Sequence, residues 1–533
     1  FTVTADSKTA TVTVTQNLEG LKVSAASFKV NKFGFADEDR TPLKFTVTAA
    51  EAWTSTADGW LTLSPASGDT GETEVMLTVG ENATGAPRSG EVKIITALSG
   101  LEAAVRIDQN AKNSLYDDDG EEIGHIYYSE NFDWITEYGA VADGVTNCAA
   151  AIQAAVDAAA QAGGGRVMVP AGRFLSGSVM LRSHVELHLC SGAVLQSSLR
   201  PEDIRPFRHA DADDAMDGWN GGFFLGACGG QDITISGSGV IDGQGRRVFF
   251  DRNEDNGFGE CPKAAAAFRP RMILLEDITD LTIRDVTLRD AAFWTLHMAG
   301  CRRVRIRDIR ILNDDRGANN DGIDPDCCQD VIISGCLIHT GDDAIVVKAT
   351  GPMTRRYGPC CNVTITNCVL HSRDSALKIG TETCGDIRNI TFGDCLVKDC
   401  SRAVGIWVRD GGTVENIQVH HLVGAVRRYA DRYSVPGAPG WWGKGEALFV
   451  NATRRAGQDN FPGVIRNVSF DHITMKAESC LFFAGESYAP LYNIRAEAVD
   501  LTLCRQGTQP GGLFDEQPSA RHLYPHEIPA LYA

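Results

Sequence analysis

Asn389-Ile-Thr-Phe392 belongs to a series of short β-like runs, most of which begin with a polar corner residue. The other runs begin at Asp232, Asp280, Arg303, Asp330, Asn362, Asn416 and Asn467. From Asp280 onward the steps between starts are 23, 27, 32, 27, 27 and 51 residues, and the last step fits two repeats. A period in the twenties with one strand signature per repeat indicates a solenoid, in which each repeat stacks on the next.

These runs, their Asn, Asp or Cys corners and a helix before them favour a right-handed parallel β-helix over residues 136–505. A leucine-rich repeat is excluded because its ladder of Leu and Asn is absent. The helix is predicted over Thr146–Ala162, where an Ala-rich body follows a polar start and ends at three glycines. We expect this helix to cap the open end of the solenoid and to block edge-to-edge association.

Residues 18–112 differ in composition from the predicted solenoid, because they are rich in Thr, Val, Ser and Gly and contain no Cys. Apolar and polar residues alternate, as in Leu43-Lys-Phe-Thr-Val-Thr48, and turn-forming residues separate the alternating runs. This pattern predicts an immunoglobulin-like β-sandwich, so the whole chain is expected to be all-β. The remaining segments are predicted to be the remnant of a preceding β-sandwich module (1–17), a linker (113–135) and a C-terminal tail (506–533).

Composition limits the partners of the chain. It has 50 Lys and Arg against 69 Asp and Glu, a net charge of −19, so its surface repels nucleic acid. No apolar run approaches the roughly 18 residues that a membrane span needs. The 16 Cys include no Cys-x-x-Cys pair, which argues against a structural zinc site. We expect thiols stacked in a repetitive core, with at most one or two disulfides.

Two acidic motifs carry the predicted chemistry. Asp321 lies in Asn319-Asn-Asp321, and Asp342 and Asp343 lie in Gly341-Asp-Asp343, a step of 21 residues from the first acid. Because 21 residues are about one coil, we expect the three carboxylates to meet in one cleft on adjacent coils. Repulsion between them raises the pKa of at least one and keeps it protonated near neutral pH. One protonated acid beside ionised partners is the equipment for cleaving a glycosidic bond.

Two other interpretations of these acids stay open. Asp and Asn supply turn chemistry at solenoid corners, which explains Asp330 or Asn362 better than it explains the adjacent pair Asp342 and Asp343. Clustered carboxylates on a β-helix also bind Ca²⁺ in some proteins. We favour the hydrolytic arrangement, and we expect neither a metal ion nor a cofactor.

From about Thr136 to Leu503 the sequence resembles glycoside hydrolase family 28, the polygalacturonase family. Besides the two acidic motifs, the resembling stretches are Tyr138–Thr146, Gly163–Gly172, Ile235–Gly245 and Phe293–His297. The resemblance implies that Asp342 is the general acid and that Asp321 and Asp343 activate water for a single-step inversion. The substrate-binding residues that we expect are His297, Asn320, Lys348, Lys378, Trp407 and Arg409.

Two signatures of that family are altered. Ser375, in Asp374-Ser-Ala-Leu-Lys-Ile-Gly380, takes the place of the usual His. Trp407-Val-Arg409 replaces the Arg-Ile-Lys string that grips a galacturonate carboxylate, so one cation is lost to Trp407. We therefore predict a pectic or related glycan as substrate, with plain polygalacturonate cleaved poorly.

The predicted sandwich resembles the BACON domain, which is typical of exported bacterial systems that degrade polysaccharides. The resembling residues are Trp53, Trp60–Gly68, Asn82–Gly85, Arg88–Gly90 and Val105–Gln109. The resemblance implies a periplasmic, cell-surface or secreted bacterial enzyme that acts, as a monomer, on a polysaccharide or oligosaccharide. A buried core residue is the commoner role for Trp53 and Trp60 than a sugar-stacking one.

Two alternative functions belong to other classes. A polysaccharide lyase would need Ca²⁺ and a basic residue that abstracts the C5 proton. A non-catalytic glycan-binding or adhesive solenoid would need no chemistry at Asp342, so Asp342→Asn would leave its function intact.

Overall fold

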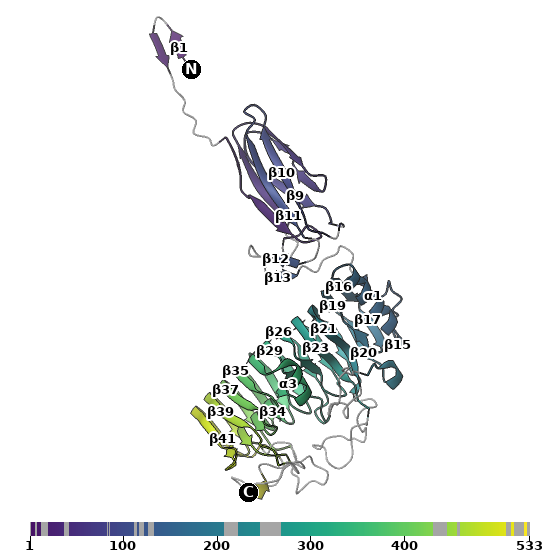
Figure 1. Cartoon of the computed structure of the whole chain (residues 1–533), viewed down its shortest axis with the longest axis vertical. Coiled ribbons are helices and arrows are strands. Elements are labelled where there is room, and N and C mark those ends of the chain that lie inside the picture. The colour runs from purple at the N-terminus through teal and green to yellow at the C-terminus, as the bar shows by residue number, and fades with distance from the viewer. Residues whose placement is uncertain are drawn as a thin grey trace. The chain divides into compact units, whose positions relative to one another are not determined.

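In the computed structural model the chain forms two compact units, which divide between Asn131 and Phe132 (Figure 1). The structure describes residues 20–36, 42–110 (except 83 and 85), 133–206, 222–245, 268–429, 445–455 and 459–507. Outside these ranges it gives the backbone of β1 (Thr2–Ala5), β2 (Lys8–Thr11), β12 (Ser114–Tyr116), β13 (Glu122–His125), β42 (Leu513–Asp515) and β43 (Glu527–Pro529). Most of the predicted segments 1–17, 113–135 and 506–533 therefore lies outside the described residues. None of the helices described is long and apolar enough to cross a membrane.

The first unit contains the predicted β-sandwich. One sheet has the order β4 (Ser27–Val30), β11 (Glu102–Gln109), β10 (Arg88–Thr96), β6 (Trp53–Ala57) and β8 (Ser67–Gly68). The other has the order β3 (Leu21–Val23), β5 (Leu43–Ala49), β9 (Gly71–Val79) and β7 (Leu61–Ser64). Alternate residues of these strands, such as Phe45 and Val47, face a shared core that includes Trp53. The guanidinium of Arg88 lies 4.2 Å from the ring centroid of Trp60, so this Trp is partly covered as well.

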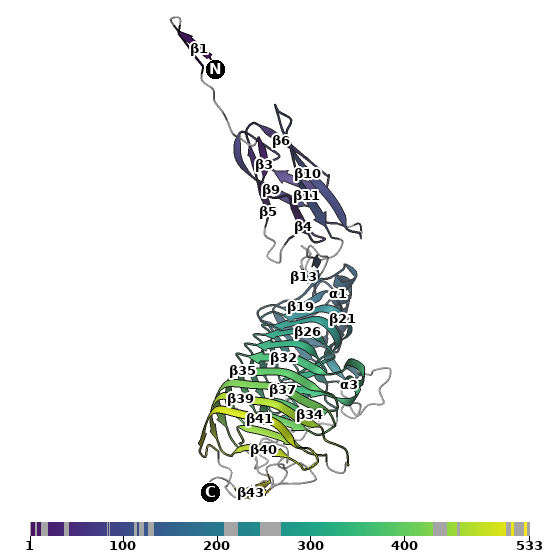
Figure 2. The same ribbon diagram turned by 60° about the vertical axis from the view of Figure 1, so that its left-hand side comes forward.

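The second unit is a parallel β-helix, which confirms the prediction. Its 28 strands, β14 to β41, form one continuous sheet that winds through successive coils (Figures 1 and 2). Strands of adjacent coils pair in parallel along three ladders. Six long strands bend from one ladder into the next: β21 (Phe223–Ser236), β23 (Arg271–Arg284), β35 (Ile387–Cys400), β37 (Thr413–Val426), β39 (Val464–Ala477) and β41 (Leu491–Leu503).

The shorter strands divide among the ladders. The first ladder adds β14 (Asp133–Trp134), β16 (Gly165–Val169), β19 (Val185–Leu189), β26 (Arg302–Arg307), β29 (Gln329–Ser334) and β32 (Cys360–Thr366). The second adds β15 (Asp143–Asn147), β17 (Gly172–Ser176), β20 (Ala193–Ser197), β22 (Val240–Asp242), β24 (Thr287–Arg289), β27 (Arg310–Leu312), β30 (Leu337–Thr340) and β33 (Val369–Ser372). The third adds β18 (Val179–Met180), β25 (Leu296–Ala299), β28 (Ile323–Asp326), β31 (Ile345–Ala349), β34 (Ser375–Thr383), β36 (Arg402–Val408), β38 (Leu448–Ala452) and β40 (Leu481–Gly485).

The repeated register explains both the core and the corners. In the first ladder Leu281, Val304, Val331, Val363 and Ile390 stack on one another and are buried. The cysteines that the structure describes are free, and most of them are buried in or beside this core. The run-starting residues named above have left-handed backbone angles, such as φ 58° at Asp330 and Asn389. Asn and Asp tolerate that conformation better than other side chains, which is why they recur there.

Helix α1 (Ala149–Gln161) confirms the predicted helix and starts three residues later than expected. Its buried face, which includes Ile152 and Val156, packs against the first coils, since it contacts β14, β18 and β19. A second helix, α3 (Gly351–Tyr357), is inserted between β31 and β32, and a 3₁₀ turn covers Pro201–Asp203.

Candidate active site

The predicted acids lie at the turns that lead from the second ladder into the third. Asp321 precedes β28, Asp342 and Asp343 precede β31, and Asp374 precedes β34. Backbone hydrogen bonds hold these turns in register, because the Gly322 N–H donates to the Asp343 carbonyl over 2.9 Å. The turns therefore stack as one column with one acidic corner per coil.

The structure brings Asp321, Asp342 and Asp343 together. One oxygen of each carboxylate lies within 4.8 Å of the other two, and all three side chains are buried. They line a pocket of about 180 Å³. The other lining residues are Trp294, Asn319, Lys348, Asp374, Lys378, Gly380, Thr381, Glu382, Trp407 and Arg409.

Lys348 and Lys378 place two ammonium groups among these acids. Lys348 Nζ lies 3.4 Å from Asp321 and 3.3 Å from Asp324. Lys378 Nζ lies 3.0 Å from Asp343 and 3.3 Å from Asp374. Burial disfavours the charged form of both lysines, but the surrounding carboxylates outweigh burial and raise the pKa of each above its usual range. Both lysines therefore stay protonated.

The acids titrate as a coupled group. Burial and then the charges of Asp321 and Asp374 raise the pKa of Asp342 to about 7. Burial and then Asp374 raise the pKa of Asp343 to about 7 against the opposing effect of Lys378, and burial raises that of Asp321 well above its usual range. At neutral pH the cluster therefore retains protons that exposed aspartates lose.

Asp342 differs from the other two acids in its partners. Asp321 and Asp343 each form an ion pair with a lysine, whereas Asp342 forms none within the described part of the chain. Its oxygens instead accept backbone hydrogen bonds from Asn319 and Asp343, each over 3.0 Å. Among the described residues, therefore, Asp321 and Asp343 each have a lysine that directly favours the ionised form, and Asp342 has no such lysine.

Trp407 and Arg409 lie on one wall of the pocket. The Trp407 side chain is almost wholly buried, and its ring centroid lies 5.5 Å from that of Phe449. The Arg409 guanidinium lies 4.9 Å from the Trp407 ring centroid and donates to the Arg454 carbonyl over 2.9 Å. Packing thus covers most of the Trp407 indole and leaves little of it for contact with a sugar.

Two predicted substrate contacts do not line the pocket. The Asn320 side chain is fully buried, because its Nδ2 donates to the Asp314 carbonyl and its Oδ1 accepts from the Gly341 N–H. It holds the two acidic turns together. His297 is also buried, 3.5 Å from Asp326 and edge-on to Trp294, and burial lowers its pKa to about 4. Neither residue is placed to contact a sugar, so both assignments are corrected to positioning roles.

The structure adds residues that sequence reasoning missed. Asp374 bonds Lys378 and receives a hydrogen bond from Ser375 Oγ over 3.0 Å, so Ser375 serves the buried column rather than the pocket. Glu382 lies 3.6 Å from Lys348. Arg269 Nη2 donates to Asn319 Oδ1 over 3.0 Å and supports the backbone that bonds Asp342. A signal existed only for Asp374, which stands one coil after Asp342 and Asp343.

A larger hollow, of about 510 Å³, lies elsewhere on the solenoid. It is lined by corner residues and their neighbours, among them Asn389, Asn416 and Asn467. None of its lining residues is an acid, a histidine or a cysteine, and Arg495 is its one charged side chain. The smaller acidic pocket is therefore the candidate for chemistry, although it is not the largest hollow.

Comparison with known families agrees with this geometry. Residues 168–423 match the model of glycosyl hydrolases family 28. Residues 51–110 match the BACON model, an N-terminal binding-domain family, and residues 134–190 match the model for rhamnogalacturonase A/epimerase, pectate lyase-like.

Individual proteins give the same picture. The chain is 30% identical over 314 residues to the "Probable polygalacturonase" of Vitis vinifera, covering 56% of this chain and 61% of that protein. It is 26% identical over 295 residues to the "Exo-poly-alpha-D-galacturonosidase" of Dickeya chrysanthemi, covering 47% of each. The chain thus spans less than two thirds of the length of these relatives. A hyperthermoactive exopolygalacturonase from Thermotoga maritima shares the fold, with a TM-score of 0.51 and 22% identity over 68% of this chain and 82% of that one.

Proposed function

We propose that the chain is an inverting glycoside hydrolase of family 28 acting on a pectic or related glycan, because residues 168–423 match the model of that family. The observation that carries the proposal is the asymmetry within one buried cluster: Asp321 and Asp343 are paired with lysines, and Asp342 pairs with none of the lysines that the structure describes. A cluster with one protonated acid and two lysine-paired carboxylates supplies both the general acid that protonates the leaving oxygen and the base that activates water. The resemblance to BACON domains supports a periplasmic, cell-surface or secreted location.

Asp342 gives its proton to the glycosidic oxygen as the bond to the anomeric carbon breaks. Asp343 and Asp321, whose ionised forms Lys378 and Lys348 favour, act as the base that accepts a proton from the attacking water. Asp342 then recovers a proton from solvent, and the base releases to solvent the proton that it took from the water. Each lysine also disfavours the protonated form of the base beside it, which favours the proton on Asp342.

Inversion is assigned from the family resemblance rather than from the carboxylate spacing. The nearest oxygens of the three acids lie within 4.8 Å, below the roughly 6.5–9.5 Å between carboxyl groups of most inverting enzymes and nearer the roughly 5–5.5 Å of retaining ones. Proton NMR of the first-formed anomer tests this directly. A product with the anomeric configuration of the substrate would contradict inversion while leaving hydrolysis in place.

Charge in the pocket argues against plain polygalacturonate as the preferred substrate. Lys348 lies within 3.6 Å of three carboxylates and Lys378 within 3.3 Å of two, so both ammonium groups are already compensated. A galacturonate carboxylate would compete with these acids. Charge-assisted hydrogen bonds contribute about 1.5–3 kcal/mol each, so one lost cation weakens binding roughly ten- to a hundredfold. A neutral or deoxy sugar at the cleaved bond fits the pocket better.

The same lysines weigh against the calcium-dependent lyase. A Ca²⁺ bound by Asp321, Asp342 and Asp343 would sit beside Nζ atoms 3.4 Å and 3.0 Å from two of its ligands. Two fixed positive charges at such distances oppose a divalent cation.

The test is a screen of purified chain against polygalacturonate, branched pectic glycans and neutral plant glycans, with Asp342→Asn as the inactive control. We expect hydrolysis without the ultraviolet absorbance of an unsaturated product, and at least tenfold faster cleavage of a branched or neutral glycan than of polygalacturonate. Efficient cleavage of polygalacturonate that survives Trp407→Ala and is lost in Arg409→Ala would overturn the substrate assignment.

A further inference from the structure

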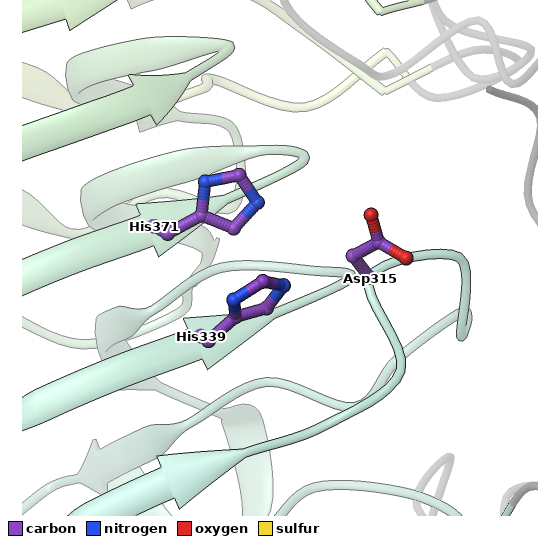
Figure 3. Close-up of side chains that lie close together, drawn as sticks. All are labelled: Asp315, His339 and His371. Atoms are coloured by element: carbon purple, nitrogen blue, oxygen red, sulfur yellow. The ribbon is translucent and has the colours of Figure 1, made fainter.

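Two histidines and an aspartate meet outside the active site. His339 is the penultimate residue of β30 and His371 that of β33, while Asp315 lies in the segment between β27 and β28. Figure 3 shows the two imidazole rings one above the other on adjacent coils, with the Asp315 carboxylate beside them. The three residues are half-buried, and one possible ligand atom of each lies within 4.8 Å of the other two.

The register of the solenoid fixes the histidine pair. His339 and His371 are direct partners in the parallel ladder, and their ring centroids are 4.1 Å apart. Asp315 is held on its other side by Arg373, which donates to its Oδ2. That bond orients the carboxylate and leaves its Oδ1 as a ligand.

His371 has the arrangement of a metal ligand. Its Nδ1 lies 2.8 Å from the carbonyl of Lys398, an oxygen that can only accept, so Nδ1 carries the proton. The lone pair is then on Nε2, which is buried and has no hydrogen-bond partner among the described residues. A histidine whose Nδ1–H bonds a backbone carbonyl is the usual form in which Nε2 binds a metal. A buried nitrogen acceptor left unsatisfied is otherwise costly.

We propose that Asp315, His339 and His371 form a Zn²⁺ site on the outer surface of the solenoid, with solvent as the fourth ligand. Two imidazoles and one carboxylate suit a borderline-soft divalent ion. Bonds of about 2.0–2.2 Å place tetrahedral ligands roughly 3.3–3.5 Å apart, so side-chain rotations of about 1 Å complete the site. Because the Arg373 charge opposes the ion, we expect micromolar rather than tighter affinity.

A Zn²⁺ ion at this site would link the segment that contains Asp315, which precedes Asp321, to the two coils that carry His339 and His371. The carbonyl of Asp314, the neighbour of Asp315, accepts from the Asn320 amide over 2.7 Å, and Asn320 is adjacent to Asp321. Arg373 likewise precedes Asp374. The ion would therefore stabilise the turns that carry the acids without touching substrate. This inference stands independently of the hydrolase assignment.

The experiment uses the full chain, stripped with a chelator and dialysed, then titrated with Zn²⁺ by calorimetry and, separately, with Co²⁺ by visible absorption. We expect micromolar Zn²⁺ binding and Co²⁺ d–d bands without the near-ultraviolet charge-transfer band of a thiolate ligand. That second readout matters because Cys228 and Cys384 are exposed thiols. A thiolate band, or no Zn²⁺ binding below millimolar concentration, would overturn the site.

His371→Asn is the sharpest variant, since its amide can keep the hydrogen bond to Lys398 while removing the Nε2 ligand. We expect at least a tenfold loss of Zn²⁺ affinity and loss of the rise in melting temperature that Zn²⁺ gives the parent chain. His421→Ala is the matched control, because His421 belongs to a second, exposed cluster with Asp394 and His420. Unchanged Zn²⁺ affinity in both His371→Asn and His339→Ala would refute the proposal.

Discussion

Two columns of polar side chains run along the same solenoid from coil to coil, and they behave in opposite ways. In the corner column Asp330, Asn362, Asn389, Asn416, Asn467 and Asn493 are exposed, and each Asn Nδ2 donates to the residue of the coil before it over 2.8–3.2 Å. In the acidic column Asp321, Asp342, Asp343 and Asp374 are buried, and all of them except Asp342 pair with a lysine.

The difference shows what repetition does to different functional groups. Each amide is both donor and acceptor, so stacking satisfies it and stabilises the coil. A carboxylate is acceptor only, so stacking creates repulsion that raises its pKa. The same register therefore stabilises the coils where the stacked residues are asparagines and creates a reactive acid where they are aspartates. The acidic column lowers the stability of the fold.

The largest expected effect is the loss of the general acid. Asp342→Asn keeps the size of the side chain but cannot donate its proton in the same way, so we expect kcat to fall by about 10²–10⁴-fold. Steady-state kinetics on the substrate found in the screen measures this. Asp330→Asn is the matched control, because it places in the corner column the residue that the neighbouring coils already carry. A large activity loss in Asp330→Asn, or none in Asp342→Asn, would break the contrast between the columns.

The second prediction removes a lysine from the acidic column. Lys378→Met leaves Asp343 buried without its ion pair and Asp374 with only Arg402, 3.6 Å away, and breaking a buried pair costs about 3–5 kcal/mol of unfolding free energy. We expect a much lower melting temperature by calorimetry. Lys398→Met, at an exposed position of β35, serves as the control and should change stability by under about 0.5 kcal/mol. Equal effects of the two substitutions would show that the lysine pairing is not required.

The third prediction uses pH to measure how much the proton on Asp342 contributes to stability. The folded pKa of Asp342, about 7, is above its unfolded value, so stability that depends on its proton is present at low pH and lost as pH rises through about 7. Because an amide does not ionise, Asp342→Asn should exceed the parent in stability by on the order of 1–3 kcal/mol at pH 8 and by less at pH 5. Melting curves at both values test this. A gain that is the same at both pH values would mean that burial of the charge is not its cause.

Much of this contrast could be predicted from the sequence. The repeat of polar corner residues predicted the solenoid, and the 21-residue step from Asp321 to Asp342 predicted adjacent turns, because register in a β-helix converts sequence period into spatial stacking. The next acid, Asp374, was missed since α3 lengthens the following coil and breaks the period.

The burial of individual side chains could not be predicted from the sequence, because it depends on neighbours that are distant in the chain. Asn320 and His297 have side chains suited to sugar contacts, yet both are buried: Asn320 bonds neighbouring backbone, and Trp294 lies edge-on to His297. The cluster of Asp315, His339 and His371 was not predicted for a similar reason. His339 and His371 are 32 residues apart, and only the inserted helix α3 brings that spacing into register.

The smallest expected effect tests the corner column itself. Asn416 donates to Asn389 and accepts from Asn467, and its φ is 57°. Asn416→Ala removes both hydrogen bonds and puts an alanine into a left-handed conformation, so we expect a loss of about 1–2 kcal/mol in stability with unchanged kcat. Asn416→Gly removes the bonds but adopts this φ without strain, and should be less destabilised than Asn416→Ala by roughly 0.4–1 kcal/mol. Chemical denaturation of the three proteins measures the difference. If glycine is as damaging as alanine, the amide bonds alone stabilise the corner; if kcat falls as well, the two columns are coupled and the separation drawn between them does not hold.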